Sequence, residues 1–308
     1  MLKVKLDLTL IRRISNINGD FMVDYSLFLG CYIPAMQPFV EASMRRISQK
    51  IGINLIDING ATCCPVPEIT RLVDEELWLT VAARNIALAE KIGKDIMVMC
   101  NGCWETLYEV NEHLIHSKEI MDKINANLNS FELKFNGIIK VKHYVEVLFE
   151  DVGLNVIKEN VKVNLSKFKF ALHPGCKLYK MVDEKGAKYL KEIVKALNVE
   201  IVDYGLERVC CGYPLMLYSV DKAMRERTKW KLDSMKNSEV DAIIVACPAC
   251  YDQFEKTQLT LKDEGIEYGI PVLHLSELIA LSFGIPPRDV GLDSHGISTD
   301  KIISGLVG

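Results

Sequence analysis

The sequence of 308 residues has no long hydrophobic run and no excess of basic charge. No apolar stretch reaches the roughly 18 to 20 residues that a helix needs to cross a bilayer, so we expect no membrane span. The formal net charge is -4 and the lysines are spread along the chain, which argues against a nucleic-acid partner. A flavin- or nucleotide-binding motif is not evident either. We therefore expect a globular, cytoplasmic protein.

Cysteine is abundant instead. Ten cysteines could form a disulfide scaffold, but such scaffolds are short and secreted, so metal or redox chemistry is the better explanation. The cysteines form two sets with one pattern, in which a single cysteine is followed by an adjacent pair and then by C-x-x-C. The first set is Cys31, Cys63, Cys64, Cys100 and Cys103, and the second set is Cys176, Cys210, Cys211, Cys247 and Cys250.

The two sets are related by an internal repeat. The last four cysteines of each set superpose with a single offset of 147 residues, whereas buried packing cysteines would be scattered. The motif His143-x-x-Glu146 recurs as His274-x-x-Glu277 at an offset of 131 residues instead of 147. The first half therefore carries extra residues before its histidine, around residues 121–135. The repeat predicts two similar structural units.

Short β-rich runs alternate with long helical patterns, which predicts two pseudo-symmetric α/β units with short parallel sheets. The cysteine groups follow predicted strands or precede helices, so we expect both sites at the C-terminal ends of the strands. We expect an N-terminal extension over 1–22, a first domain over 23–155 and a second over 156–308. The expected strands are 25–29, 54–58, 95–99, 169–173, 200–203 and 242–246, and the expected helices are 38–52, 68–93, 104–112, 185–197, 220–236 and 249–263.

The spacing suits metal binding. C-x-x-C places two sulfurs on one metal site, whereas an adjacent pair of cysteines reaches different metals only if the backbone bends sharply. Gly212, which follows the second pair, suits such a bend, and Pro65 takes the same place after the first pair. Four thiolates make a closed zinc site and four also hold a cubane, so a fifth indicates a larger or more open cluster, or a redox-active spare. Spacing alone leaves iron and zinc both open.

Other side chains near the cysteines have two explanations each. His143 and His274 are weak candidates for catalytic proton donors, but each ends a short strand before a helix, so capping with the glutamate three residues later is the better explanation. Tyr213, Tyr218 and His173 could line a pocket, and aromatic packing explains them equally well.

From about Tyr25 to Ile297 the sequence resembles the CCG-domain proteins, and within them the B subunit of heterodisulfide reductase. The tail and histidine segments are more specific than the cysteines, which other branches of the family share. The similar segments are Phe28-Leu29-Gly30-Cys31, Thr62-Cys63-Cys64-Pro65, Cys100-Asn101-Gly102-Cys103, His143 to Leu148, Cys247-Pro248-Ala249-Cys250, Val272-Leu273-His274 and Val290-Gly291-Leu292-Asp293-x-His295.

The resemblance implies that each five-cysteine set binds one noncubane [4Fe-4S] cluster and that the two clusters face a shared substrate cavity. The implied substrate is the mixed disulfide of coenzyme M and coenzyme B, an intermediate of methanogenesis, which is reduced to two thiols. The implied partners are the ferredoxin-like iron–sulfur C subunit and the flavin-containing A subunit of such an enzyme, with a hydrogenase or formate dehydrogenase reached through the complex.

Two segments of the second half depart from the family pattern. Gly-Tyr-Pro-Leu-Met-Leu follows Cys210-Cys211 where a glycine-rich stretch is expected, and Lys177 stands where a histidine is usual. These departures leave the exact substrate open and the ligand set intact, so a related protein that acts on thiols or persulfides in the oxidative direction is an alternative. Two further alternatives are an iron–sulfur subunit of a lactate or glycolate oxidising system, which should lack the tail over 290–295, and a zinc-stapled scaffold without chemistry.

Overall fold

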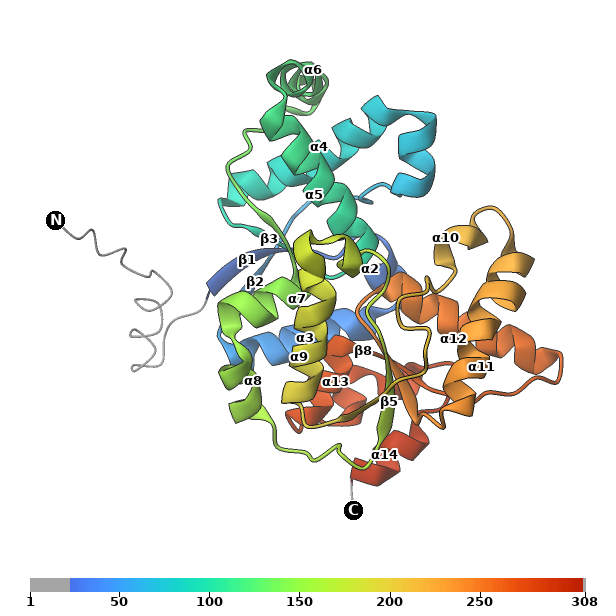
Figure 1. The fold of residues 1–308 in the computed structure, drawn as a ribbon. Coiled ribbons are helices and arrows are strands. Elements are labelled where there is room, and N and C mark those ends of the chain that lie inside the picture. The colour runs from blue at the N-terminus through green and yellow to red at the C-terminus, as the bar shows by residue number, and fades with distance from the viewer. Residues whose placement is uncertain (1–22, 307–308) are drawn as a thin grey trace.

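The computed structural model describes residues 23–306, so the expected N-terminal extension over 1–22 lies outside the described residues. Two separate parallel sheets of four strands each form the framework (Figure 1). The first sheet has the order β2-β1-β3-β4 and the second has the matching order β6-β5-β7-β8. The strands are β1 (Val23–Phe28), β2 (Ile53–Asp57), β3 (Ile96–Val98), β4 (Val141–His143), β5 (Lys169–His173), β6 (Glu200–Val202), β7 (Ala242–Val245) and β8 (Val272–His274). The predicted α/β class with two similar units is confirmed.

The strands are parallel because a helix carries the chain back over the sheet between them. The central strands β3 and β7 are buried throughout, as expected for strands covered on both faces. The helices are α2 (Tyr32–Met36), α3 (Pro38–Ile51), α4 (Glu75–Ile92), α5 (Asn101–His116), α6 (Lys118–Leu128), α7 (Tyr144–Glu146), α8 (Leu154–Asn160), α9 (Lys185–Ala196), α10 (Tyr213–Met216), α11 (Lys229–Asn237), α12 (Pro248–Asp263), α13 (Leu275–Ser282) and α14 (Asp300–Leu306), with π-helices at Pro67–Arg71, Val147–Val152 and Lys222–Thr228.

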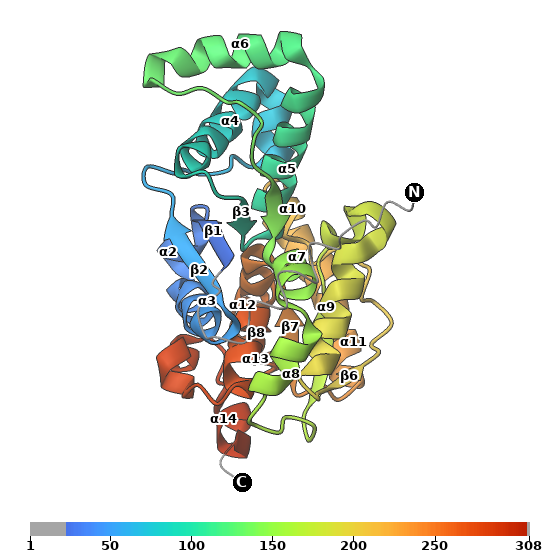
Figure 2. The same ribbon diagram turned by 90° about the vertical axis from the view of Figure 1, so that its left-hand side faces the viewer.

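The prediction of one helix over 68–93 is wrong. The chain forms a π-helix at Pro67–Arg71 and then breaks at Asp74, whose backbone is extended. The Asp74 carboxylate accepts a hydrogen bond of 2.9 Å from the backbone N–H of Leu77, so Asp74 caps α4. The expected helix over 220–236 is likewise a π-helix that continues into α11. The extra residues of the first half form α6, which projects from the end of α5 in Figure 2.

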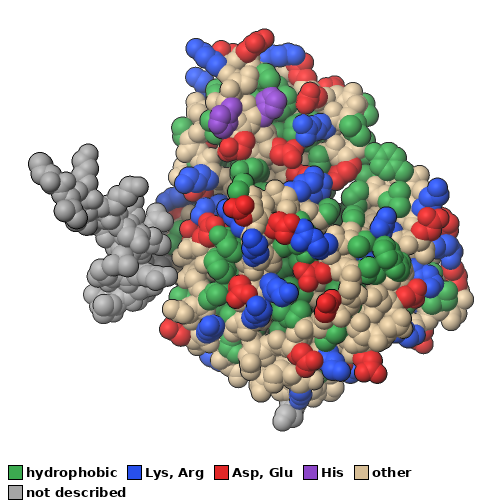
Figure 3. All heavy atoms as spheres, in the orientation of Figure 1, with side chains coloured by type: hydrophobic (Ala, Val, Ile, Leu, Met, Phe, Trp, Pro, Cys, Tyr) green, Lys and Arg blue, Asp and Glu red, His purple; other side chains and the backbone are tan. Residues whose placement is uncertain are grey.

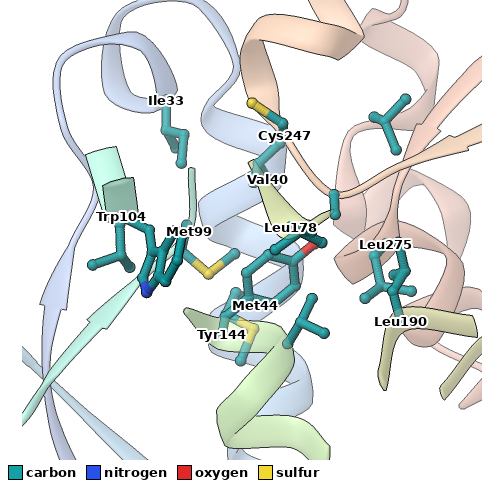
Figure 4. Packing of buried hydrophobic residues seen from close by; sticks show 14 of the residues in the cluster. Ile33, Val40, Met44, Met99, Trp104, Tyr144, Leu178, Leu190, Cys247 and Leu275 are labelled. Carbon is teal, nitrogen blue, oxygen red and sulfur yellow. The ribbon is translucent and has the colours of Figure 1, made fainter. Parts of the chain in front are cut away.

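Each half contributes a helix to the core of the other. Helix α3 of the first half packs on α13 of the second, and α9 of the second packs on α7 and the π-helix that follows it. The hydroxyl of Ser276 in α13 donates a hydrogen bond of 3.3 Å to the carbonyl of Val40 in α3. The close-up in Figure 4 shows Tyr144 and Leu178 between Val40 and Met44 on one side and Leu275 on the other, in one core that includes residues of both halves. The division at 155/156 separates the two sheets, but their cores are continuous.

Candidate metal centres

Both C-x-x-C motifs lie at the start of a helix. Cys100 and Cys247 are the N-cap residues of α5 and α12, and Cys103 and Cys250 lie in the first turns of those helices. The thiol of Cys100, at the start of the other helix, and the thiol of Cys250 lower the pKa of Cys247, and the backbone N–H of Cys250 adds to this effect. A helix N-terminus favours a thiolate, which is the form that binds metals.

The adjacent cysteine pairs are held by buried polar side chains. Asn85 accepts from the backbone N–H of Thr62 at 2.9 Å and donates to the carbonyl of Cys63 at 3.1 Å. In the second half, the hydroxyl of Thr228 donates to the carbonyl of Cys211 at 2.7 Å. Gly212 has φ +106°, so the bend expected after the second pair is present. Asn85 and Thr228 were not singled out from the sequence, because they lie in helical segments far from the cysteines.

The five thiols of each half follow one another in the same spatial order. In the first half, the thiols that shift the pKa of their neighbours form the series Cys31, Cys63, Cys64, Cys103 and Cys100, and the Sγ atoms of Cys31 and Cys63 lie 3.6 Å apart. In the second half the corresponding series is Cys176, Cys210, Cys211, Cys250 and Cys247. The two series meet where the Sγ atoms of Cys100 and Cys247, which are equivalent in the repeat, lie 3.9 Å apart. All ten predicted residues are therefore brought together.

A glycine precedes the first cysteine of each set, and both glycines have a positive φ. A Cβ on Gly30, at φ +68°, would lie 2.8 Å from the Sγ of Cys103. A Cβ on Gly175, at φ +82°, would lie 2.6 Å from Nδ2 of Asn101 and 3.4 Å from the Sγ of Cys250. Glycine is therefore required at both places, by the Cys103 thiol at Gly30 and by the Asn101 amide next to the Cys250 thiol at Gly175, so each half has a close-fitting cradle.

A single cavity of about 120 Å³ is lined by all ten cysteines. Apolar side chains such as Leu29, Val66 and Leu217 line it further. Tyr213 also lines the cavity, in an edge-to-face contact with Tyr32 at 6.2 Å between ring centroids, as the sequence suggested. Tyr218 and His173 are not among the lining residues. Tyr218 is exposed and donates a hydrogen bond of 2.8 Å to the carbonyl of Glu68.

Lys177 is the one cationic side chain among the described residues that line this cavity. Its Nζ lies 2.8 Å from the carboxylate of Glu68 and also pairs with Glu105, which Lys180 contacts as well. Burial lowers the pKa of Lys177, but hydrogen bonds from the ammonium to Glu105 and Glu68 outweigh this effect and raise it. Lys177 therefore keeps a positive charge at the cavity wall.

His143 and His274 are capping residues. The imidazole of His143 accepts from the backbone N–H of Val145, and Glu146 accepts from the N–H of His143 at 2.9 Å. His274 forms the same capping box with Glu277. The free oxygen of Glu277 binds His295 of the C-terminal tail at 2.7 Å, as that of Glu146 binds Lys185. The capping role is confirmed, and neither histidine lines the cavity.

These two histidines make acid instability an expected outcome. Burial lowers the pKa of His143 to about 3 and that of His274 to about 4, against about 6.5 in an unfolded chain. Unfolding therefore takes up protons below pH ~6.5, and stability present above that pH is lost as pH falls towards the folded pKa values. Each histidine should contribute a slope of up to about 1.4 kcal/mol per pH unit.

The measurement is the urea unfolding midpoint at about pH 7 and about pH 5.5. The double variant His143→Asn/His274→Asn is the comparison, because asparagine is also a good N-cap residue but does not titrate in this range. Its midpoint should vary less with pH than that of the original chain. An equal loss of stability in both proteins would contradict the prediction.

One trio of potential metal ligands among residues 23–306 has all its ligand atoms within 4.8 Å of one another. It consists of His173, Cys211 and Cys250.

No helix among residues 23–306 combines the length and apolar character needed to cross a membrane. Acidic and basic side chains are interspersed over the face in Figure 3, without a large field of one sign.

The sequence matches the family model of the cysteine-rich domain named CCG, over residues 25–108 and 170–255. It is 33% identical to the B subunit of the ferredoxin/F420H2-dependent CoB-CoM heterodisulfide reductase of Methanosarcina acetivorans, covering 92% of this chain and 97% of the relative. It is 37% identical to a protein of Archaeoglobus profundus described as similar to the heterodisulfide reductase B subunit, covering 87% of this chain and 93% of the relative.

A more distant relative and a solved structure are also similar to this chain. An 8-methylmenaquinol:fumarate reductase membrane anchor subunit of Wolinella succinogenes is 28% identical, and the match covers 91% of this chain and 99% of the relative. The crystal structure of a hypothetical protein from Helicobacter pylori has a TM-score of 0.72 at 16% identity, and the match covers 97% of this chain and 58% of that chain. The latter supports the fold alone. The repeat, the two cysteine sets and these similarities agree, and the chain belongs to the CCG cysteine-rich family, in the group of heterodisulfide reductase B subunits.

Proposed function

We propose that this chain is the catalytic iron–sulfur subunit of a heterodisulfide reductase-type enzyme, which reduces the mixed disulfide of coenzyme M and coenzyme B to two thiols. The observation that carries the proposal is that ten cysteines from two repeated units line one cavity. The names of the most similar relatives supply the substrate and the enzyme class, an oxidoreductase acting on a sulfur group.

The ten cysteines are the proposed ligands of two noncubane [4Fe-4S] clusters. The matching order of the thiols, the glycine cradles and the helix N-termini support one cluster in each half. Five thiols per half exceed the four of a closed zinc site or of a cubane, which supports a more open cluster. The first set is Cys31, Cys63, Cys64, Cys100 and Cys103, and the second set is Cys176, Cys210, Cys211, Cys247 and Cys250.

The reaction needs two electrons and two protons for each disulfide, and its products are two thiols. Iron–sulfur clusters supply one electron at a time, together with irons that have affinity for sulfur. The residues of this chain place both cysteine sets on one cavity, so that each set faces one sulfur of the substrate. The side chains of Leu29, Val66 and Leu217 make part of the cavity wall apolar. Lys177, which follows Cys176 in the chain, would hold a proton at Nζ in this wall.

The proposed partners are a ferredoxin-like C subunit and a flavin-containing A subunit, with hydrogenase or formate dehydrogenase reached through the complex. Exposed apolar side chains support a protein contact near the cavity mouth, because Leu72 is 76% exposed, Val73 is 82% exposed and Tyr218 is 67% exposed. Hydrophobic side chains are also visible along the right-hand side of Figure 3. We propose a cytoplasmic location, because ten free thiols require a reducing compartment.

A second candidate function is electron transfer in a complex that acts on a different substrate. The relative from Wolinella succinogenes, whose name places it in a fumarate reductase, favours it, because the similarity extends over nearly the whole of both chains. A chain of that kind would carry electrons through its cysteine-bound clusters without reducing a disulfide.

The test is metal analysis of anaerobically purified protein, paired with EPR after oxidation in the presence of coenzyme M. We expect about eight irons and a similar amount of sulfide per chain, with a new signal that appears only when the thiol is added. Reduced viologen should then drive cleavage of the coenzyme M–coenzyme B disulfide. Iron without a thiol-dependent signal or disulfide cleavage would favour the electron-transfer candidate, and one or two zinc ions without iron would refute both.

A further inference from the structure

The two cysteine sets have different surroundings on the side away from the cavity. His173, the last residue of β5, is 1% exposed, and neither ring nitrogen has a hydrogen-bond partner among the described residues. One of its ring nitrogens lies within 4.8 Å of the sulfurs of Cys211 and Cys250. The ring is held by an edge-to-face contact with Phe254, at 5.1 Å between centroids. A buried polar group without a partner is rare, and this imidazole lies beside two thiols of the second set.

The first half has a phenylalanine at the equivalent position. Phe28 ends β1 and pairs in register with Val98, just as His173 ends β5 and pairs with Val245. Val98 and Val245 each lie two residues before the first cysteine of a C-x-x-C motif. Phe28 is as buried as His173 but has no polar atom in its side chain. Only the second set therefore has an imidazole behind its thiols.

A buried cation accompanies this imidazole. Lys231 in α11 is fully buried, and its ammonium donates to the carbonyls of Leu206 and Val209, at 2.7 Å in the latter case. No carboxylate forms an ion pair with it among the described residues. Burial lowers the pKa of Lys231 to about 8, and the nearby thiols of Cys211, Cys250 and Cys210 oppose this effect. The thiols of the second cysteine set, together with the carboxylate of Glu207, are thus the negative groups that favour this buried cation.

The residue equivalent to Lys231 in the repeat is Arg84, at the offset of 147. Arg84 is only partly buried, and its guanidinium donates a hydrogen bond of 3.0 Å to the carbonyl of Gly60. This hydrogen bond lies at the protein surface. Water therefore screens the charge of Arg84, whereas the charge of Lys231 acts through the protein interior. Neither His173 nor Lys231 lines the cavity, so both reach the thiolates from the protein side and not the substrate.

We propose that His173 and Lys231 give the centre held by the second cysteine set a higher reduction potential than the centre held by the first. The inference rests on the proposed function, because it requires one cluster in each half. Reduction adds negative charge, which a nearby cation and an N–H donor to a ligand sulfur stabilise. Neither ring nitrogen of His173 has another partner among the described residues, and one of them lies within 4.8 Å of the sulfurs of Cys211 and Cys250, so an imidazole N–H is placed beside these ligands. His173 and Lys231 are positioning residues, and the second centre is the one that is reduced first.

The experiment is an EPR-monitored redox titration of the iron-loaded chain with dithionite and mediator dyes. The matched variants exchange the two equivalent residues, as His173→Phe and Phe28→His, so each introduces a side chain that the other half already accommodates. Lys231→Met removes the buried charge, and Lys231→Arg keeps it. The signals are assigned with Cys210→Ala and Cys63→Ala, which are expected to retain only the first and only the second centre respectively.

The His173→Phe variant should keep its full iron content, and its second centre should be less reduced than that of the original chain at the same solution potential. We expect at least a tenfold change in the ratio of reduced to oxidised centre, which corresponds to about 59 mV for a one-electron couple. Phe28→His should raise the potential of the first centre. Lys231→Met should lower the potential of the second centre, whereas Lys231→Arg should leave it unchanged.

Two centres whose potentials do not respond to these substitutions would overturn this inference alone. Loss of about half the iron from His173→Phe would also overturn it and would make His173 a ligand. A chain without iron would overturn the proposed function as well.

Discussion

Replacing Cys210 with alanine is expected to leave about four of the about eight irons per chain and to abolish disulfide reduction. Cys210 is the second thiol in the series of its set and lies between Cys176 and Cys211. Its sulfur also accepts from the backbone N–H of Gly212 at 3.5 Å. Hydrogen bonds from Cys176 and Cys211 lower the pKa of Cys210, which favours the thiolate form that binds metals. The substitution therefore removes one of the five proposed ligands of the second centre.

The matched comparison is Cys63→Ala, which makes the same change in the first half. Each variant should retain the EPR signal that the other loses, and neither should turn over the disulfide, because the proposed reaction uses both centres. Iron, sulfide and viologen-driven disulfide cleavage are measured on the same preparations. Normal turnover by the Cys210→Ala protein would rule out a mechanism that requires two centres.

Gly30→Ala should have a comparable effect on the first centre, with loss of about half the iron. The new Cβ would lie 2.8 Å from the Sγ of Cys103, a distance that Cβ atoms do not adopt. Cys103 is buried in the first turn of α5 and cannot move aside without leaving its neighbours Cys64 and Cys100. The substitution therefore displaces a thiol that the first set requires.

The control for this variant is Gly93→Ala. Gly93 has φ +73°, close to the φ of +68° at Gly30, but a Cβ there would meet nothing within 4 Å. Both variants incur the backbone strain of about 1 to 2 kcal/mol for a non-glycine residue in the left-handed region, and only Gly30→Ala adds the clash with a thiol. Gly93→Ala should lower the thermal midpoint and keep its iron. Equal iron loss from the two variants would show that strain, and not the cradle, is responsible.

The residues that the sequence identified best are those that recur. The fixed offset of 147 singled out the cysteines, and the recurring histidine motif located the two capping boxes, because both patterns are local and repeated. Six of the eight strands were predicted to within two residues at each end, since buried parallel strands are short apolar runs. The strands β4 and β8 were expected only as the short strands that end at His143 and His274. The prediction missed the break at Asp74 because the break consists of one extended residue, and the sequence on both sides of it is compatible with a helix.

The residues that the repeat does not share could not be predicted in the same way. His173 was noticed only as a neighbour of Cys176, and its contact with Cys211 and Cys250 depends on how β5 and α12 pack. Lys231 is one lysine among many in a charged helical pattern, and nothing in that pattern indicates that it is fully buried. The burial of Lys231 without an acidic partner depends on how the helices pack, so only the folded structure reveals it.

The reciprocal packing of α3 on α13 and of α9 on α7 is the contact that two copies of one half would make around a twofold axis. The contact between Cys100 and Cys247 lies where such an axis would pass, because a residue near the axis meets its own equivalent. A half-length ancestor could therefore have built this cavity as a homodimer, with identical residues at both positions. Covalent fusion of the copies removed that constraint, and it allowed Phe28 and His173 to diverge at one structural position within a single chain.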